Sequence, residues 1–156
     1  MRRATLAALA ALALLLTVSF SAVSAAGMQA GVFHLTLTGD QEATATCAPP
    51  TVCGDPDAVA TMVVIVIPAT DRVCFVTKWS GIDGTVVAAH IHPAPAGVAG
   101  PVAIPLFSGS FAGTDKAHGC VSANGLAAAL LADPSGYYVN IHSSVFQPGA
   151  VRAQLG

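Results

Sequence analysis

The sequence predicts an all-β protein, an antiparallel sandwich or barrel with one short helix. Two observations predict this fold class. Short runs rich in β-branched residues recur along the chain, and Gly, Pro or Asp residues interrupt them every 8–12 residues or so. The chain has 156 residues, which is room for one domain, and it shows no internal repeat and no dividing linker.

The elements follow from the alternation of apolar and polar residues. Residues 32–38 alternate with a period of two and end at a Gly-Asp pair, which is typical of a half-buried strand and a turn. Residues 58–67 form a β-branched run closed by a proline, which predicts a core strand. The other predicted strands cover 73–79, 84–92, 102–107, 136–142 and 150–155. One helix is predicted over 124–132.

The first residues have the pattern of a secretory signal peptide. Met1-Arg-Arg precedes an uncharged run of Ala and Leu, and small residues at 21–26 supply a cleavage site. We therefore expect a signal peptide over 1–26 and a domain over 27–156. The product would be secreted, extracellular or in the cell envelope, with no membrane span after cleavage. An uncleaved anchor is the alternative, since this run could just cross a bilayer.

Because an exported protein meets oxidising conditions, we expect its four cysteines to form two disulfides. Cys47 and Cys53 flank a Pro-rich loop and are close enough in sequence to close it locally. We expect the pairs Cys47–Cys53 and Cys74–Cys120, one of three pairings. A cysteine metal site is disfavoured because the spacings match no zinc-ligand pattern.

Composition and motifs exclude several functions. Only 9% of the residues are charged and the formal net charge is −2, so the chain lacks the basic surface of a nucleic-acid binder. It also lacks a nucleophile-elbow pattern, a phosphate-cradling glycine motif and a defensible pair of acid and base carboxylates. We therefore expect no enzymatic activity and no nucleic-acid partner.

Two predicted strands carry histidines that can converge. His90 and His92 are separated by one residue, so both project from the same face of their strand. Asn140 and His142 share a face in the same way. If the two strands are neighbours, His90, His92 and His142 can form a copper or zinc site, because neutral imidazole suits both ions. The alternatives are a hydrogen-bond network that ties the 93–101 loop to the sheet, and a contact for a small ligand or peptide.

Four motifs in order resemble a known family. They are Gly39-Asp-Gln-Glu, Ala89-His-Ile-His, Tyr138-Val-Asn-Ile-His and Gly149-Ala-Val-Arg-Ala-Gln-Leu. Together they resemble the CHRD domain, repeated in chordin and found singly in many bacterial secreted proteins, over residues 31–155. The matching positions are Gln41, Glu42, His90, His92, Asn140, His142 and Arg152. The chain departs where Ala43 to Cys47 separates Gln-Glu from Pro-Pro, and where Ala150 and Ala153 replace an acidic residue and a glycine.

The resemblance implies a Greek-key sandwich, immunoglobulin-like or superoxide-dismutase-like, and no known activity. We expect an exported binding module for an extracellular protein or matrix ligand. A metal-binding or redox protein and a structural envelope component are the alternatives. Copper–zinc superoxide dismutase also combines a His-x-His strand with an arginine near its C-terminus, loosely like Arg152. The loop after His92 lacks the bridging and zinc ligands, however, so dismutase activity is not expected.

Four further residues have simple interpretations. Glu42 is a candidate ion-pair partner of Arg152. Asp55 and Asp57 could offer calcium oxygens, but two carboxylates around a proline are more typical of a turn. His118 is expected in a surface turn.

Overall fold

The computed structural model describes residues 29–47 and 51–156. Its strands are β1 (Gly31–Thr38), β2 (Val59–Ile67), β3 (Arg72–Ser80), β4 (Val86–Pro93), β5 (Ile104–Ser108), β6 (Lys116–Ser122), β7 (Tyr137–Ser143) and β8 (Val151–Gln154). Its helices are α1 (Ala127–Ala132) and the 3-10 turns η1 (Gly39–Gln41), η2 (Pro68–Thr70) and η3 (Pro134–Gly136). The signal peptide expected over 1–26 lies outside the described residues. Within the described ranges, no helix has the length and apolar character that a membrane span requires.

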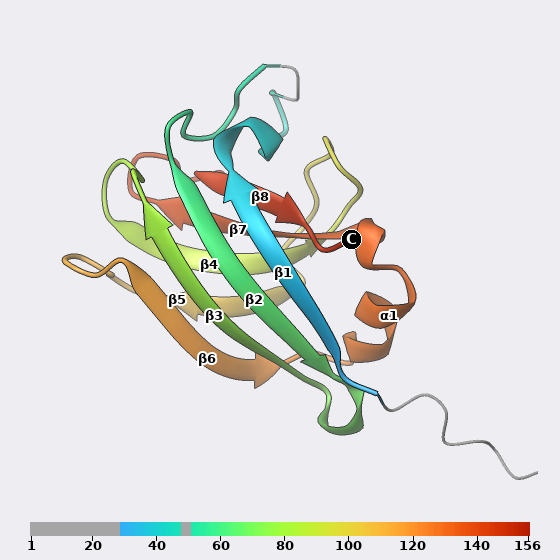
Figure 1. Ribbon diagram of the computed structural model, residues 1–156. Helices are drawn as coiled ribbons and strands as arrows, with labels where there is room; N and C mark the ends of the chain where they lie inside the picture. The colour runs from blue at the N-terminus through green and yellow to red at the C-terminus, as the bar shows by residue number, and fades with distance from the viewer. Residues whose placement is uncertain (1–28, 48–50) are drawn as a thin grey trace, which may run out of the picture.

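All eight strands form one antiparallel sheet in the order β5-β4-β7-β8-β1-β2-β3-β6. The sheet curls so that β5-β4-β7-β8 faces β1-β2-β3-β6, as Figure 1 shows. The two halves join where β8 meets β1, through the register pair Thr38 and Arg152. The edge strands β5 and β6 also approach each other, so the sheet is nearly closed into a barrel. The predicted all-β antiparallel fold with one short helix is confirmed.

The core lies between the two halves. In β2, alternate residues from Ala60 to Val66 are buried, while the residues between them face outward. β7 contributes Val139 and Ile141 from the facing half, both fully buried. This alternation follows from the two-residue period of a strand, which sends successive side chains to opposite faces.

The helix is shorter than predicted. It begins at Ala127, because Asn124 and Gly125 take positive φ values of 54° and 82°, which an α-helix does not allow. The carboxylate of Asp71, in the turn between β2 and β3, accepts a hydrogen bond from the Gly125 N–H at 2.7 Å. Leu130 of the helix is fully buried in the core.

Strand β6 was not predicted, and His118 is an exposed residue of this strand and not part of a turn. The sequence Lys-Ala-His-Gly-Cys-Val-Ser has few β-branched residues, so its intrinsic preference for a strand is weak. It forms a strand because it pairs with β3 from Arg72 to Lys78. Cys74 and Cys120 are opposite each other in this register and form a disulfide. The second disulfide is Cys47–Cys53, and both are the pairs that the sequence predicts.

Candidate functional site

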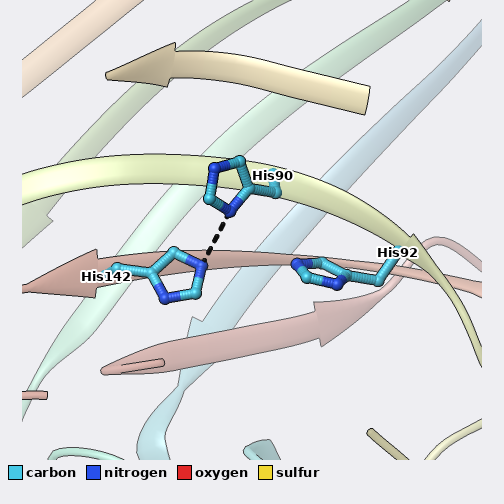
Figure 2. Close-up of side chains that lie close together, drawn as sticks. All are labelled: His90, His92 and His142. Carbon is cyan, nitrogen blue, oxygen red and sulfur yellow. Dashed lines mark hydrogen bonds between the residues drawn. The ribbon is translucent and has the colours of Figure 1, made fainter. Parts of the chain in front are cut away.

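The histidines lie on neighbouring strands, as the metal-site hypothesis requires. β4 and β7 pair so that His90 is opposite Asn140 and His142 is opposite Ala88. One nitrogen from each of His90, His92 and His142 lies within 4.8 Å of the other two. Figure 2 shows the rings of His90 and His142 facing each other, with His92 farther along β4. The sequence therefore predicted the convergence of the three side chains.

His90 and His142 are joined by a hydrogen bond of 3.0 Å between Nδ1 of His90 and Nε2 of His142. The Nδ1–H of His142 donates to the backbone carbonyl of Gln147 at 2.8 Å. A neutral imidazole carries one N–H, so Nε2 of His142 presents a lone pair and Nδ1 of His90 is the donor. The carbonyl of Gln147 thus fixes the tautomer of His142 and the direction of its lone pair.

His92 is held in the same way. Its Nδ1 lies 2.9 Å from the backbone carbonyl oxygen of Gly100, and its Nε2 lies 3.1 Å from the side-chain oxygen Oδ1 of Asn140, so both ring nitrogens lie next to hydrogen-bond acceptors. The ring stacks on Tyr138 with centroids 4.7 Å apart and planes inclined by 2°. A neutral ring carries a single N–H, so it donates to only one of these two oxygens, and Nε2 serves as a metal ligand only when the proton is on Nδ1 and the Asn140 oxygen turns away.

The segment 94–103 between β4 and β5, here called the covering loop, lies beside the ends of β7 and β8 (Figure 1), and it bonds to Tyr138 and Arg152 on the outer face of these strands. Arg152 on β8 donates to the carbonyls of Pro95 and Val98 at 2.9 and 3.0 Å. The guanidinium carbon of Arg152 also lies 3.4 Å from the ring centroid of Tyr138, a cation–π contact. These bonds, with those of His92, are the network that the sequence suggested between this loop and the sheet.

Glu42 is fully buried and is linked to the cluster through Asn140. Its Oε1 accepts from the Ala43 N–H at 3.0 Å, and its Oε2 accepts from the Asn140 amide at 3.4 Å. Gly149 permits this approach, because a Cβ there would lie 2.0 Å from Oε2. The expected Glu42–Arg152 ion pair does not form, since the guanidinium is directed to the covering loop. Within the described ranges, Lys78 and Asp115 form the only ion pair.

Burial sets the protonation of these groups. It lowers the pKa of His90 to about 4, with help from repulsion by His142 and His92. Burial also lowers the pKa values of His92 and His142, so all three rings are neutral at pH 7. The pKa of Glu42 is raised because burial outweighs its hydrogen bonds and the attraction of Arg152.

The three nitrogens fit a metal ion after a small movement. Nitrogens bound tetrahedrally at about 2.0–2.1 Å lie about 3.3 Å apart. The 3.0 Å pair of His90 and His142 already has nearly this spacing, and the widest gap, at most 4.8 Å, has to close by no more than about 1.5 Å. Backbone carbonyls orient His92 and His142, the outer contact that ligating histidines usually have. His90 becomes a ligand by moving its proton from Nδ1 to Nε2.

Of the seven positions that match the CHRD motifs in the sequence, six converge at this site. Gln41 does not, because its amide donates to Thr36 and Thr38 on the exposed side of η1. Sequence reasoning missed the part played by Tyr138, which separates His92 from Arg152 and accepts a hydrogen bond from the Gly100 N–H at 3.2 Å. Its position two residues before Asn140, on the same face, was the available signal.

Comparisons with known proteins give one match. Residues 33–155 match the CHRD domain, which is almost the whole described chain. No curated protein and no solved structure matches the chain.

Proposed function

The chain belongs to the CHRD domain family, and from this premise we propose that it is an exported, non-enzymatic module that binds a copper or zinc ion through His90, His92 and His142. The convergence of three imidazole nitrogens within 4.8 Å carries this proposal. The two disulfides agree with an oxidising, extracellular environment. The chain binds the ion without turning over a substrate, since its sequence has no recognised catalytic pattern.

The site suits a transition metal in three ways. Its donors are neutral imidazoles, which bind copper and zinc at pH 7 without first losing a proton to solvent. His92 and His142 are held by backbone carbonyls, so little side-chain entropy is lost on binding. The third ligand, His90, is half-buried and gives the site its access to solvent.

The test is a calorimetric titration of copper(II) and of zinc into the metal-free, oxidised chain. We expect the wild type to bind one equivalent of metal. In His142→Ala, we expect the affinity to be on the order of 100-fold weaker than in the wild type, or too weak to measure. His118→Ala is the matched control, since His118 is an exposed histidine on β6 outside the cluster. The proposal would be overturned if the wild type gave no more saturable heat than His142→Ala does.

The pH dependence sharpens this test. Protons compete with the metal for the same lone pairs, and the pKa of His90 is lowered to about 4. Binding should therefore persist at about pH 5.5, where an ordinary histidine is mostly protonated, and be lost as the pH falls toward 4. Loss of binding already at pH 6.5 would mean that exposed histidines hold the metal.

A second candidate function is the docking of an extracellular protein or matrix partner on the outer face of β1, β2 and β3. Val32, Val76 and Val59 on this face are 54%, 60% and 39% exposed. Val63 and Val76 are opposite each other in the register of β2 and β3, so two outward apolar side chains are adjacent on this face. A partner retained by the wild type and by His142→Ala, but not by Val76→Glu, would support this function and separate it from metal binding.

A further inference from the structure

The outer face of β1, β2, β3 and β6 carries most of the positive charge of the described residues. These four strands lie side by side across the front of Figure 1. Arg72, Lys78 and Lys116 are on β3 and β6, and Arg152 is the only other lysine or arginine in the described ranges. None of the eight acidic residues of the chain lies on these strands. A chain with a formal net charge of −2 therefore has one sheet face whose charge is positive.

The strand register arranges the outward side chains of this face in rows, because residues opposite each other on antiparallel strands point to the same side. Two neighbouring rows cross all four strands, and they consist of Thr36, Thr61, Lys78 and Lys116, and of His34, Val63, Val76 and His118. Neighbouring strands are about 4.8 Å apart, so each row is about 14 Å long. On β1, β2 and β3 the two rows line a groove of about 380 Å³.

Lys78 and Lys116 form the cationic end of this groove. They are directly opposite each other in the register of β3 and β6, where two like charges repel. Asp115 lies 3.9 Å from the Lys78 ammonium, but both side chains are more than 60% exposed, so water weakens this pair. Lys116 has no ion-pair partner within the described ranges. An anion placed between the two ammonium groups would neutralise their repulsion.

We propose that this face binds an anionic polysaccharide and that Lys78 and Lys116 hold one of its carboxylates. The inference rests on the docking face given above as the second candidate function, and it names the chemistry of the partner. The hydroxyls of Thr36 and Thr61 continue the lysine row and can exchange hydrogen bonds with sugar hydroxyls. Val63 and Val76 supply an adjacent apolar strip for the C–H faces of the sugar rings.

Other anionic partners fit this face less well. The backbone groups of β2 and β3 are paired within the sheet, so an extended acidic peptide gains no main-chain hydrogen bonds from their outer face. Segments that bind anionic membranes carry clusters of about four to eight lysines or arginines, and a nucleic acid also demands a dense basic patch. A polymer with sparse charge and many hydroxyls matches one lysine pair beside threonines and valines.

The experiment is a calorimetric titration of hyaluronate oligosaccharide, which has one carboxylate in each disaccharide repeat, into the oxidised full chain freed of metals. Physiological ionic strength is used, so that charges more than about 8 Å apart are screened. We expect saturable binding that Lys78→Gln and Lys116→Gln each weaken roughly tenfold. Asp115→Asn should bind about twofold to threefold more tightly, because it removes the carboxylate that competes for Lys78.

The matched control for the lysine variants is Arg72→Gln. It removes the same charge from the same strand, but six residues away from Lys78, or about 20 Å. It should therefore bind as the wild type does. An equal loss of affinity in Arg72→Gln and Lys78→Gln would show that net charge governs binding, and this would overturn the proposal. The absence of saturable binding in the wild type would overturn it as well.

Thr61→Val tests whether the face recognises a sugar or only a carboxylate. This exposed change removes a hydroxyl and keeps the branched shape, so it should weaken hyaluronate binding about threefold. Poly-glutamate is the comparison ligand, since it offers carboxylates without sugar hydroxyls. If poly-glutamate binds as tightly as hyaluronate and Thr61→Val changes neither affinity, the partner is an acidic protein and the polysaccharide is excluded.

Failure of this inference is distinguishable from failure of the proposed functions. His142→Ala should bind hyaluronate as the wild type does, because the histidine cluster is on β4 and β7. If Val76→Glu releases a protein partner while the wild type binds no hyaluronate, the docking face stands and its assignment to a polysaccharide is wrong.

Discussion

Strands β2 and β7 are each flanked by strands on both sides, yet their outer faces have opposite environments. In β2 the outer residues are exposed or half-buried, and only the inner face is sealed in the core. In β7 every residue from Tyr138 to Ser143 is buried, because the covering loop and the segment before β8 lie over its outer face. The outer face of β7 therefore forms a second buried layer, in which the side chains are polar.

This difference shows how one sheet carries both a stable core and a chemical site. An apolar core needs only volume and the correct face, and it tolerates change in its details. A buried polar layer needs a partner for each donor and acceptor, which makes it expensive to disturb. The layer on β7 holds Glu42 and Arg152 as well as the histidines, so we expect its residues to be far more sensitive to substitution than those on the outer face of β2.

The largest expected effect is that of Arg152→Ala. Removing the guanidinium leaves the carbonyls of Pro95 and Val98 without their donor and leaves the buried Glu42 without a nearby cation. We expect the free energy of unfolding in urea to fall by about 3–5 kcal/mol, because each carbonyl left without its charged donor costs about 1–3 kcal/mol and the cation–π contact with Tyr138 is lost as well.

The control for that substitution is Arg72→Ala. Arg72 is an exposed arginine whose guanidinium donates to the carbonyl of Cys120 at 2.8 Å. Its removal should cost about 1 kcal/mol or less. Equal losses in the two variants would show that the polar layer is no more sensitive than the surface.

The inner faces of the two strands should behave alike. Met62 on β2 and Ile141 on β7 are 1% and 0% exposed in the same core. Truncation of either to Ala leaves a cavity, so each should lower the free energy of unfolding by about 2–5 kcal/mol in urea denaturation. A loss below about 1 kcal/mol for Ile141→Ala alone would mean that the β7 half is loosely packed, and the contrast would then not be confined to the outer faces.

How much of this follows from sequence differs between the two strands. The two-residue alternation of β2 predicts both its structure and its faces, because local pattern and burial agree. The same alternation in β7 predicts that Asn140 and His142 share a face, but it leaves open whether that face holds a metal, contacts a ligand or forms a network with the 93–101 loop. Only the long-range bonds of Arg152 to the covering loop show that the face is sealed.

Two parts of the chain were beyond sequence reasoning for related reasons. Strand β6 has a weak intrinsic preference and exists because β3 offers it a pairing edge and Cys74 a disulfide. The approach of Asp83 to Asp55 joins loops 28 residues apart, and no local pattern encodes that contact. In both cases tertiary pairing decides the local structure.

A pH titration distinguishes the polar layer from the apolar core. The histidines of the layer have lowered pKa values, so the unfolded chain takes up protons below about pH 6.5 before the folded chain does. Their contribution to stability is complete above pH 6.5 and is lost as the pH falls toward about 4, the pKa of His90. Glu42, whose pKa is raised, acts in the opposite direction and offsets part of this loss.

Urea midpoints at pH 7.5 and pH 5 measure this effect. We expect the wild type to be less stable at pH 5, and His90→Gln to show a smaller decrease between the two pH values. His34→Gln, at an exposed position of β1, should decrease as the wild type does. An equal decrease in all three chains would contradict the assignment of the acid sensitivity to the polar layer.

The smallest effect should come from a substitution on the outer face of the β1-β2-β3-β6 half, although the side chain changed there is apolar. Val76 on β3 is 60% exposed, so Val76→Thr removes little buried surface and keeps the β-branched shape that a strand favours. The free energy of unfolding should change by no more than about 0.5 kcal/mol.

Asn140→Ala is also a change on an outer face, but it removes a hydrogen-bond partner from His92 and from Glu42, so it should lower the free energy of unfolding by about 1–3 kcal/mol. If the two changes cost the same in urea, the covering loop does not seal the layer. The larger loss in Asn140→Ala would show that burial by a loop, and not position in the sheet, makes a face sensitive.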